Sequence, residues 1–239
     1  MTNQFDCKTC VNKNCFIQQC DANGLSFVNH KKRTDFYKSG QMIIYENTPV
    51  DRIYFVFSGK AKVYATGAFG RQQIIRFANR GDIIGHRGIN RDKWFISASV
   101  LEDSYICYIA AGDFIRLVEN NRLMMRALLL FFADELFRSE MKVKKLAMLS
   151  VKERIADALL QIQRVFSPSG KNTGVYLSRQ EIADFAGTTK EQVSRDLSEF
   201  KKDKIIDLNG KEIFILNAER LKNIARFSSD DIPNSLPEL

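Results

Sequence analysis

Between residues 41 and 109, short apolar runs alternate with glycine-containing turns. The runs are rich in β-branched and aromatic residues, as β-strands are. They predict strands at 41–45, 52–57, 60–65, 72–77, 82–84, 95–101 and 104–109. Many short strands at this spacing favour an antiparallel barrel or roll. We therefore expect a β-roll sensor domain over residues 26–120, which could enclose a small ligand or transmit a signal.

After a short helix expected at 113–120, the spacing of the apolar residues changes from that of strands to that of a helix. Residues 121–147 predict a long helix whose apolar residues recur at alternating intervals of four and three, which is a heptad pattern. The seam comprises Met125, Leu129, Phe132, Leu136, Ser139, Val143 and Leu146. A sustained heptad favours a parallel coiled coil in a homodimer, so we assign 121–149 to a dimerisation helix. A long buried intramolecular helix is the alternative.

A second apolar flank of the same helix is formed by Leu128, Phe131 and Phe137. These residues lie beside the heptad seam rather than on it. We expect this flank to lie against the roll.

The last third of the chain predicts a helix at 150–166, a break at 167–170 and two short helices within 177–206. Ser178 and Thr188 are each followed three residues later by a glutamate, which is the capping-box pattern of a helix start. Gly187 stands between the two helices, where the backbone must turn sharply. The pattern predicts a helix-turn-helix.

The outward face of the second short helix is polar. Side chains on such a face can hydrogen-bond base edges and phosphates in the major groove of double-stranded DNA. The candidate DNA-binding residues are Arg179, Thr189, Lys190, Glu191, Gln192, Ser194, Arg195, Lys201 and Lys202. An ordinary helical hairpin with a solvated polar face is the alternative interpretation.

A β-hairpin with an Asn209-Gly210 turn is predicted after these helices, followed by a short helix at 217–227. A helix-turn-helix followed by a hairpin is a winged DNA-binding unit, which we assign to residues 150–227. Residues 228–239 are polar and contain proline, and we expect them to form a loose tail.

Composition agrees with a DNA-binding protein. The chain has 239 residues, of which 45% are hydrophobic and 27% charged, and this is typical of a globular protein. A formal net charge of +8 and a pI near 9.2 suit a polyanionic partner. Because the sequence shows neither an apolar run long enough to span a membrane nor a signal-peptide core, we expect a cytoplasmic protein without a membrane partner.

Four of the five cysteines fall in the N-terminal segment 1–25, as Cys7, Cys10, Cys15 and Cys20. Cysteines stay reduced in the cytoplasm, so a cluster of them favours metal or redox chemistry over disulfides. Thiolates at such spacing can bind zinc or an iron–sulfur cluster. The alternative is an N-terminus with adventitious cysteines.

The order of these parts resembles the CRP/FNR superfamily of bacterial transcription regulators over nearly the whole chain. Gly40, Gly59, Gly81-Asp82 and Gly85 stand where its members carry roll glycines. The resemblance implies an α+β fold: an N-terminal cyclic-nucleotide-binding-like β-roll, a long dimerisation helix and a C-terminal winged helix-turn-helix. It also implies a transcription regulator, not an enzyme, that binds a pseudo-palindromic operator as a homodimer and has RNA polymerase as a partner.

The cyclic-AMP receptors of this superfamily carry a cassette resembling Gly-Glu-x-Gly, followed by Arg-Ser on the next strand. Here the cassette is Gly85-His86-Arg87-Gly88, and the dipeptide position falls near Trp94-Phe95. Burying a cyclic phosphate without its arginine would be costly, which argues against cyclic AMP. Gly85, His86, Arg87 and Gly88 remain a candidate pocket for another small effector.

The chain is more similar to the fumarate–nitrate reduction regulators, which sense oxygen. Their recognition helix carries Glu-x-x-Ser-Arg, matched here by Glu191 to Arg195, and the resemblance implies a half-site similar to TTGAT. Their 4Fe-4S cluster uses three N-terminal cysteines and one in the roll, where Cys107 stands. The implied ligands are Cys7, Cys10, Cys15 and Cys107, with Cys20 as a substitute.

That resemblance implies gating of DNA binding by oxygen or nitric oxide. Three alternatives stay open: structural zinc, no metal with a small ligand in the roll, and an iron–sulfur electron carrier. A cupin-type enzyme would need clustered histidines, and the chain has only two.

Overall fold

The structure is a computed structural model that describes residues 5–166, 175–210 and 212–226. The chain forms two compact units, one comprising residues 1–70 and 75–132 and the other 71–74 and 133–239. The long helix α3, Arg122–Met148, runs from the first unit into the second. Within the described ranges, every helix is too short or too polar to cross a lipid bilayer.

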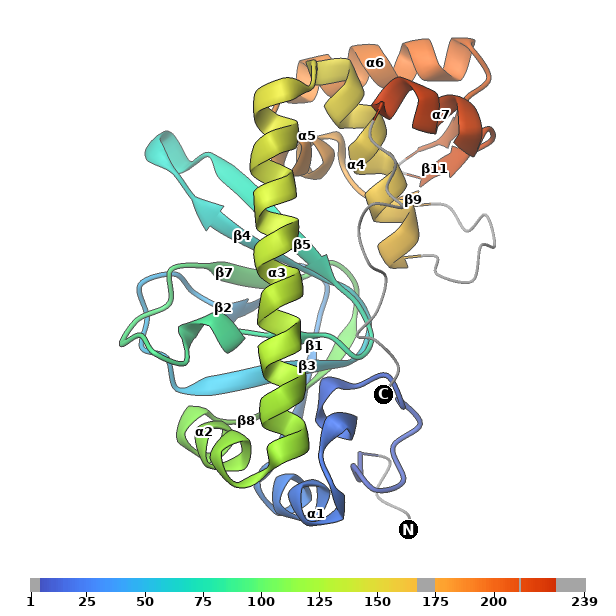
Figure 1. The fold of residues 1–239 in the computed structure, drawn as a ribbon. Helices are drawn as coiled ribbons and strands as arrows, with labels where there is room; N and C mark the ends of the chain where they lie inside the picture. Colours follow the sequence, from blue (N-terminus) through green and yellow to red (C-terminus); the bar gives the residue numbers. More distant parts are fainter. Residues whose placement is uncertain (1–4, 167–174, 211, 227–239) are drawn as a thin grey trace. The chain divides into compact units, whose positions relative to one another are not determined.

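Apart from residues 72–74, the predicted roll lies in the first unit and is built from two four-stranded sheets (Figure 1). One sheet has the order β1-β8-β3-β6, with β1 at Arg33–Tyr37, β8 at Ser104–Ala110, β3 at Arg52–Ser58 and β6 at Ile83–Ile84. The other has the order β2-β7-β4-β5, with β2 at Met42–Ile44, β7 at Ser97–Val100, β4 at Ala61–Thr66 and β5 at Gln72–Ala78. All seven predicted strands are present, with ends shifted by a few residues.

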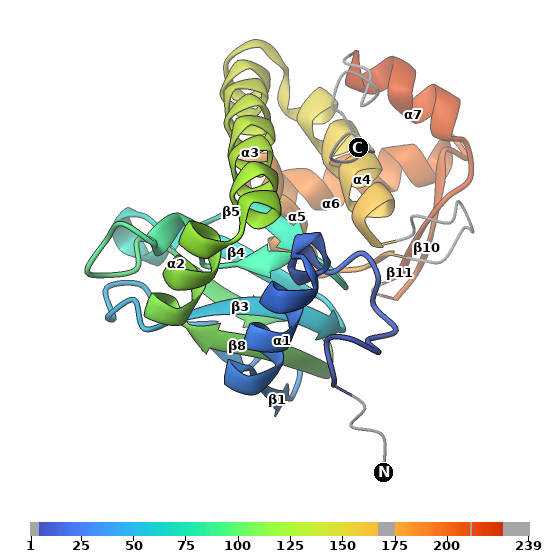
Figure 2. The same cartoon turned by 60° about the horizontal axis from the view of Figure 1, so that its bottom comes forward.

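A helix and a strand near the N-terminus were not predicted. Helix α1, Ala22–Lys31, begins where the Asp21 carboxylate accepts a hydrogen bond from the backbone N–H of Gly24. Strand β1 then pairs antiparallel with β8. Helix α1 packs on α2, Ala111–Asn120, and both contact β8 (Figure 2). The N-terminal part of the chain is therefore built onto the roll.

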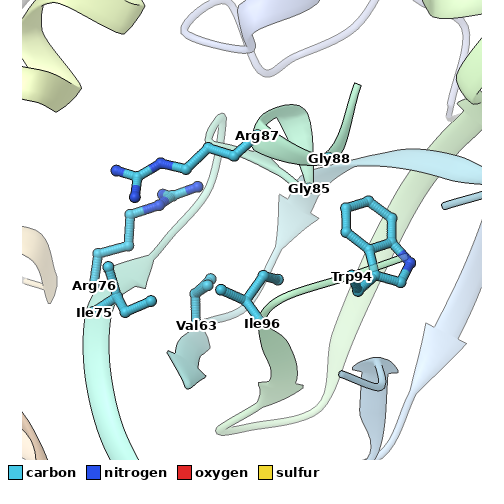
Figure 3. Close-up of a pocket in the computed structure, with 8 residues that line it drawn as sticks. All are labelled: Val63, Ile75, Arg76, Gly85, Arg87, Gly88, Trp94 and Ile96. Atoms are coloured by element: carbon cyan, nitrogen blue, oxygen red, sulfur yellow. The ribbon is translucent and has the colours of Figure 1, made fainter. Parts of the chain in front are cut away.

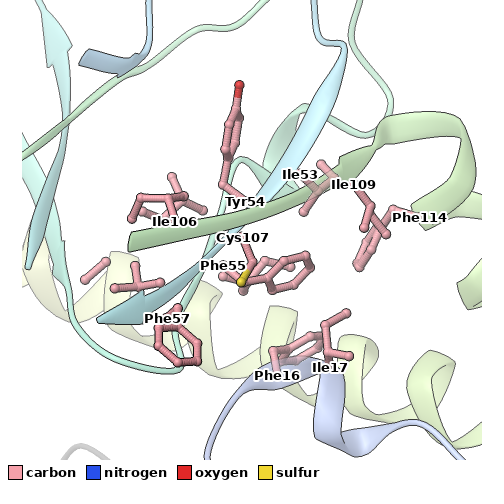
Figure 4. Packing of buried hydrophobic residues seen from close by; sticks show 14 of the residues in the cluster. Phe16, Ile17, Ile53, Tyr54, Phe55, Phe57, Ile106, Cys107, Ile109 and Phe114 are labelled. Atoms are coloured by element: carbon pink, nitrogen blue, oxygen red, sulfur yellow. The ribbon is translucent and has the colours of Figure 1, made fainter. Parts of the chain in front are cut away.

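The core of the first unit joins both sheets to the N-terminal segment and to the start of α3. Phe55 and Phe114 are almost completely buried there, and Cys107 lies among them with Phe16 of the 3-10 helix η1, Phe16–Gln19 (Figure 4). On α3, Leu128 and Phe131 pack into this core, as predicted for the second flank. Phe137 is 38% exposed, so its predicted place against the roll is not confirmed.

The second unit contains the helix-turn-helix and its wing. Besides the second half of α3, the described residues of this unit form the helices α4 at Val151–Phe166, α5 at Arg179–Ala186, α6 at Lys190–Lys202 and α7 at Ala218–Ala225. A three-stranded sheet has the order β10-β11-β9, with β10 at Ile206–Asn209, β11 at Glu212–Ile215 and β9 at Val175–Tyr176. The predicted apolar faces are buried, with Ile182 on α5 and Val193, Leu197 and Phe200 on α6 all fully covered.

Two local predictions were one residue out of place. The N-cap of α6 is Thr189 and not Thr188, because it is the Thr189 hydroxyl that accepts from the N–H of Gln192. Asn209 pairs with Glu212 as the last residue of β10, so the turn begins at Gly210. The predicted break at 167–170 and the tail at 228–239 lie outside the described residues.

A buried ion pair joins α3 to α4 within the second unit. The Lys145 ammonium lies 2.6 Å from the Asp157 carboxylate, and both side chains are more than 90% buried. The second oxygen of Asp157 accepts from the Gln161 amide at 2.6 Å. Both carboxylate oxygens are thus satisfied, which a buried charge requires.

Candidate nucleic-acid interface and sensor region

The helix-turn-helix is fixed by its caps. Ser178 and Glu181 form the predicted capping box at the start of α5. Gly187 ends α5 in the left-handed conformation, with φ of 68°. A Cβ atom there would lie 2.9 Å from a methyl group of Leu146, so the end of α3 also requires glycine at this position. The tight turn therefore needs a residue that adopts the left-handed conformation and has no side chain.

Arg154 of α4 reinforces the same turn. Its guanidinium donates to the carbonyl oxygens of Ala186 at 3.0 Å and Gly187 at 3.2 Å, at the end of α5. It also donates to Leu149 at 3.0 Å and Leu146 at 3.5 Å, at the end of α3. A cation suits these positions because the last carbonyls of a helix have no partner within the helix. One side chain therefore connects the ends of two helices.

Helix α6 places the predicted polar face at the surface. Thr189, Lys190, Glu191, Ser194 and Arg195 are exposed, and the face behind them is buried. The remaining predicted residue of this face, Gln192, is half-buried, and its side-chain oxygen accepts a 2.6 Å hydrogen bond from the Arg195 guanidinium. The structure therefore gathers donors and acceptors on one exposed face of a 13-residue helix.

The predicted cations around α6 differ in their surroundings. Lys202 is exposed, and Arg179 at the start of α5 is half-buried. Lys201 forms a 2.9 Å ion pair with Asp207 of the wing. The Lys201 ammonium lowers the pKa of the Asp207 carboxyl, so Asp207 competes with DNA phosphates for Lys201. Lys201 is thus less available to a phosphate than Lys202.

The predicted seam of α3 is exposed on the single chain. Leu129 is 69%, Leu136 62% and Val143 67% exposed, with Met125, Phe132 and Leu146 between 37% and 48%. A row of exposed apolar side chains of this kind is typical of a surface that another surface covers. The exposure of these residues favours the predicted dimer seam over a long buried intramolecular helix, and the dimer stays a prediction.

The thiols of the N-terminal segment lie in the core of the first unit. Cys7, Cys10 and Cys20 are buried, and so is Cys107 on β8, whose sulfur lies 3.3 Å from the Thr34 hydroxyl. The segment is held to the roll by a hydrogen bond from the Asn12 amide to the Val56 carbonyl at 3.3 Å. All five thiols are free.

Burial and the neighbouring thiols raise the pKa of several cysteines. Burial raises the pKa of Cys7 to about 11 and of Cys15 to about 12, and in each case Cys107 and Cys10 raise the pKa further. Burial also raises the pKa of Cys20 to about 12, but Cys7 is the only thiol that contributes. Cys15 is thus coupled to Cys7, Cys10 and Cys107, and Cys7 is coupled to Cys10, Cys107 and Cys20.

The positions of the metal-binding side chains decide whether they could share one metal ion. Throughout residues 5–166, 175–210 and 212–226, no three Cys, His, Asp or Glu side chains come close enough together to hold a metal ion. A zinc site needs its thiolates around one point, whereas a four-iron cluster gives each thiolate its own iron atom. In this structure the thiols are not gathered around one point.

Comparison with known proteins now places the chain in a family. Residues 34–121 match the cyclic nucleotide-binding domain family, and residues 153–224 match the Crp-like helix-turn-helix domain family. Together the two family models match more than half of the chain. The chain belongs to the CRP/FNR superfamily. It is a DNA-binding transcription regulator of that superfamily.

Three relatives illustrate the similarity. The transcriptional activatory protein AadR of Rhodopseudomonas palustris is 29% identical over 196 residues, which cover 79% of this chain and 80% of AadR. The fumarate and nitrate reduction regulatory protein of Vibrio cholerae is 26% identical over 196 residues, 81% of this chain and 78% of that protein. The solved structure of FixK2 from Bradyrhizobium japonicum superposes with a TM-score of 0.71 at 26% identity and covers 81% of this chain and 96% of FixK2.

The roll of this CRP/FNR protein has a cavity where an effector pocket was predicted. Gly85, Arg87 and Gly88 line it together with Trp94, Ile96, Val63, Ile75 and Arg76 (Figure 3). Its volume is about 20 Å³, which is enough for about one water molecule and far too little for a nucleotide.

His86, the fourth predicted pocket residue, is not among the lining residues. It belongs to the 3-10 helix η3, His86–Gly88, and is buried against α3. Its ring packs edge-on against Phe131, with centroids 4.8 Å apart, and lies 5.5 Å from Phe132. His86 therefore connects the edge of the pocket to α3.

Sequence reasoning did not find Arg154, the Lys145–Asp157 pair or the place of Trp94 in the cavity. Arg154 could have been noticed as a cation three residues into a helix that follows a helix end. Nothing in a single sequence pairs Lys145 with Asp157, because both also fit a solvated helix surface.

Proposed function

We propose that this regulator binds a pseudo-palindromic operator as a homodimer, with one α6 helix in the major groove at each half-site. The observation that carries the proposal is the exposed face of α6, with Glu191, Ser194 and Arg195 standing over a fully buried apolar face. That arrangement fixes the helix and leaves its polar side chains for DNA. The expected half-site is similar to TTGAT.

Each polar residue of α6 then has a role. Arg195 donates to O6 and N7 of a guanine, Ser194 contacts a thymine and Glu191 accepts from a cytosine amine. Arg195 exchanges its hydrogen bond with Gln192 for the guanine when DNA arrives. The phosphate and sugar contacts come from Arg179, Thr189, Lys190, Gln192, Lys201 and Lys202.

Replacing Arg195 by alanine tests this assignment. Affinity for the operator should fall by about 1–3 kcal/mol, and preference at one base position should be lost. Lys190→Ala is the matched control, because losing a phosphate contact weakens binding to all sequences and reduces the salt dependence by about one ion. Binding measured against operators with each base changed in turn distinguishes the two. An equal loss for Arg195→Ala on all sequences would show that its role is wrong.

Dimerisation through α3 is supported by the exposure of its seam. In a parallel pair the seam residues of one chain meet the same residues of the other, so one exposed row covers another. The two α6 helices then face DNA about one helical turn apart. RNA polymerase and a cytoplasmic location belong to the same proposal, and we infer no enzymatic activity.

We further propose a 4Fe-4S cluster held by Cys7, Cys10, Cys15 and Cys107, which when bound supplies reactivity with oxygen or nitric oxide. The mutual coupling of these four thiols supports the set. Named relatives that include a fumarate and nitrate reduction regulatory protein point the same way. In this set Cys107 ties the N-terminal segment to β8, so the ligands span the roll rather than one loop.

Anaerobic purification of the wild type, Cys107→Ala and Cys20→Ala tests the set. Iron and acid-labile sulfide should be present in the wild type and in Cys20→Ala and lost from Cys107→Ala. The reverse result for the two variants would make Cys20 the ligand. Wild-type protein without iron or sulfide that still binds operator DNA would remove the cluster and leave the regulator.

A further inference from the structure

Trp94 lies within residues 34–121, the part of the chain that matches the cyclic nucleotide-binding domain family. The residue is 3% exposed, and its indole lies against the segment Gly85–Gly88. It is fixed by its backbone, which donates to the Thr48 carbonyl at 2.9 Å and accepts from the N–H of Asn47 at 2.8 Å. The side chain is therefore a built part of the roll.

The two glycines of this segment are needed because of the indole. A Cβ atom on Gly85 would lie 2.7 Å from Cη2 of Trp94, and one on Gly88 would lie 2.5 Å from Cζ3. Real Cβ atoms do not approach other atoms so closely. The backbone of this segment thus makes the close approach that glycines permit, but it approaches the indole of Trp94 and not a bound ligand.

What remains of the site does not fit a cyclic nucleotide. The residual cavity of about 20 Å³ holds one water-sized molecule. Two guanidinium groups, from Arg76 and Arg87, lie on the same side of it (Figure 3). Arg76 donates to the Ile83 carbonyl. With the indole in place, the space left between the lining residues is too small for the phosphate, sugar and base of a cyclic nucleotide.

We propose that the indole of Trp94 is a built-in occupant of the roll, so that the site takes no cyclic nucleotide and, once emptied, accepts a planar aromatic molecule of indole size. The same side chain holds η3 in place. Because His86 of η3 packs on Phe131 and Phe132, the indole also supports α3 at the predicted seam. This second effect rests on the proposed homodimer, and the first does not.

Fluorescence of the wild-type protein tests the occupied site without any substitution, since Trp94 is the only tryptophan in the chain. Its emission should be blue-shifted, protected from iodide quenching and unchanged by millimolar cyclic AMP or cyclic GMP. A saturable red shift or loss of protection on adding either nucleotide would overturn the proposal.

A Trp94→Gly variant tests the emptied site. Its melting temperature should fall by roughly 10 °C or more, and added indole should raise it again in proportion to the logarithm of its concentration. Trp94→Phe is the control, because its ring fills most of the site and should leave little response to indole. Equal responses of the two variants to indole would contradict the proposal.

The monomer–dimer equilibrium of Trp94→Gly, measured by sedimentation with and without indole, tests the support of α3. Dimerisation should weaken in the variant and recover with indole. Recovery of melting temperature without recovery of dimerisation would reject the link through His86 and keep the occupied site. A wild type that is monomeric at every concentration would instead reject the homodimer.

Discussion

Leu136 provides a direct test of the predicted seam, because it is 62% exposed on the single chain. Complete burial of a leucine side chain stabilises by about 1.5–3 kcal/mol, and a symmetric dimer buries two copies. Leu136→Ala keeps the Cβ atom and removes most of the apolar area that the partner would cover. Scaling by the exposed fraction, we expect a loss of about 2 kcal/mol per dimer, or roughly a thirtyfold weaker dimer.

Sedimentation equilibrium over a range of protein concentrations measures this loss. Leu216→Ala is the matched control, because Leu216 is 56% exposed but follows the wing and lies off the seam. At a concentration where both are monomeric, Leu136→Ala and Leu216→Ala should have the same melting temperature, since neither side chain is in a core. Equal dimerisation constants for Leu136→Ala, Leu216→Ala and the wild type would refute the coiled-coil reasoning.

Two further predictions concern stability of the second unit. Asp157→Asn should lower the free energy of unfolding by about 3–5 kcal/mol in urea, because it leaves the Lys145 ammonium buried without its counter-charge; a smaller loss than in Gln161→Ala would contradict this. Burial lowers the pKa of Lys142 to about 8 from 10.5. As pH increases, the Lys142 ammonium loses its proton in the folded chain at a lower pH than in the unfolded chain. The free energy of unfolding therefore rises with pH between those two values. Lys142→Met should remove the increase in stability that this lysine causes. Urea midpoints of the variant and the wild type, measured at about pH 7 and about pH 10, would show the difference. An equal increase in both proteins would contradict the assignment.

The regular elements of this protein could be predicted because their signals are local. The heptad of α3, the Ser178–Glu181 capping box and the position of Gly187 each depend on residues within one or two helical turns. The error at Thr188 shows the limit of such signals. Two adjacent threonines carry the same chemistry, and the choice of Thr189 depends on where the turn after Gly187 ends.

Elements fixed by distant contacts could not be predicted. Strand β1 has little alternation of its own and is set by pairing with β8, seventy residues later. The candidate effector site was placed by its glycines, but only packing shows that Trp94 fills it and that His86 turns toward α3. The choice of Cys107 as fourth ligand, with Cys20 as a substitute, came from the family resemblance and stays a prediction.

Binding to designed operator duplexes tests the central claim, that two copies of this chain read two half-sites through α6. A duplex with two inverted TTGAT-like half-sites about one helical turn apart should bind two chains, and inserting about half a turn between them should abolish tight binding. Anisotropy titrations with sedimentation of the complex give affinity and stoichiometry together. Equal affinity for the designed, respaced and scrambled duplexes would contradict the account.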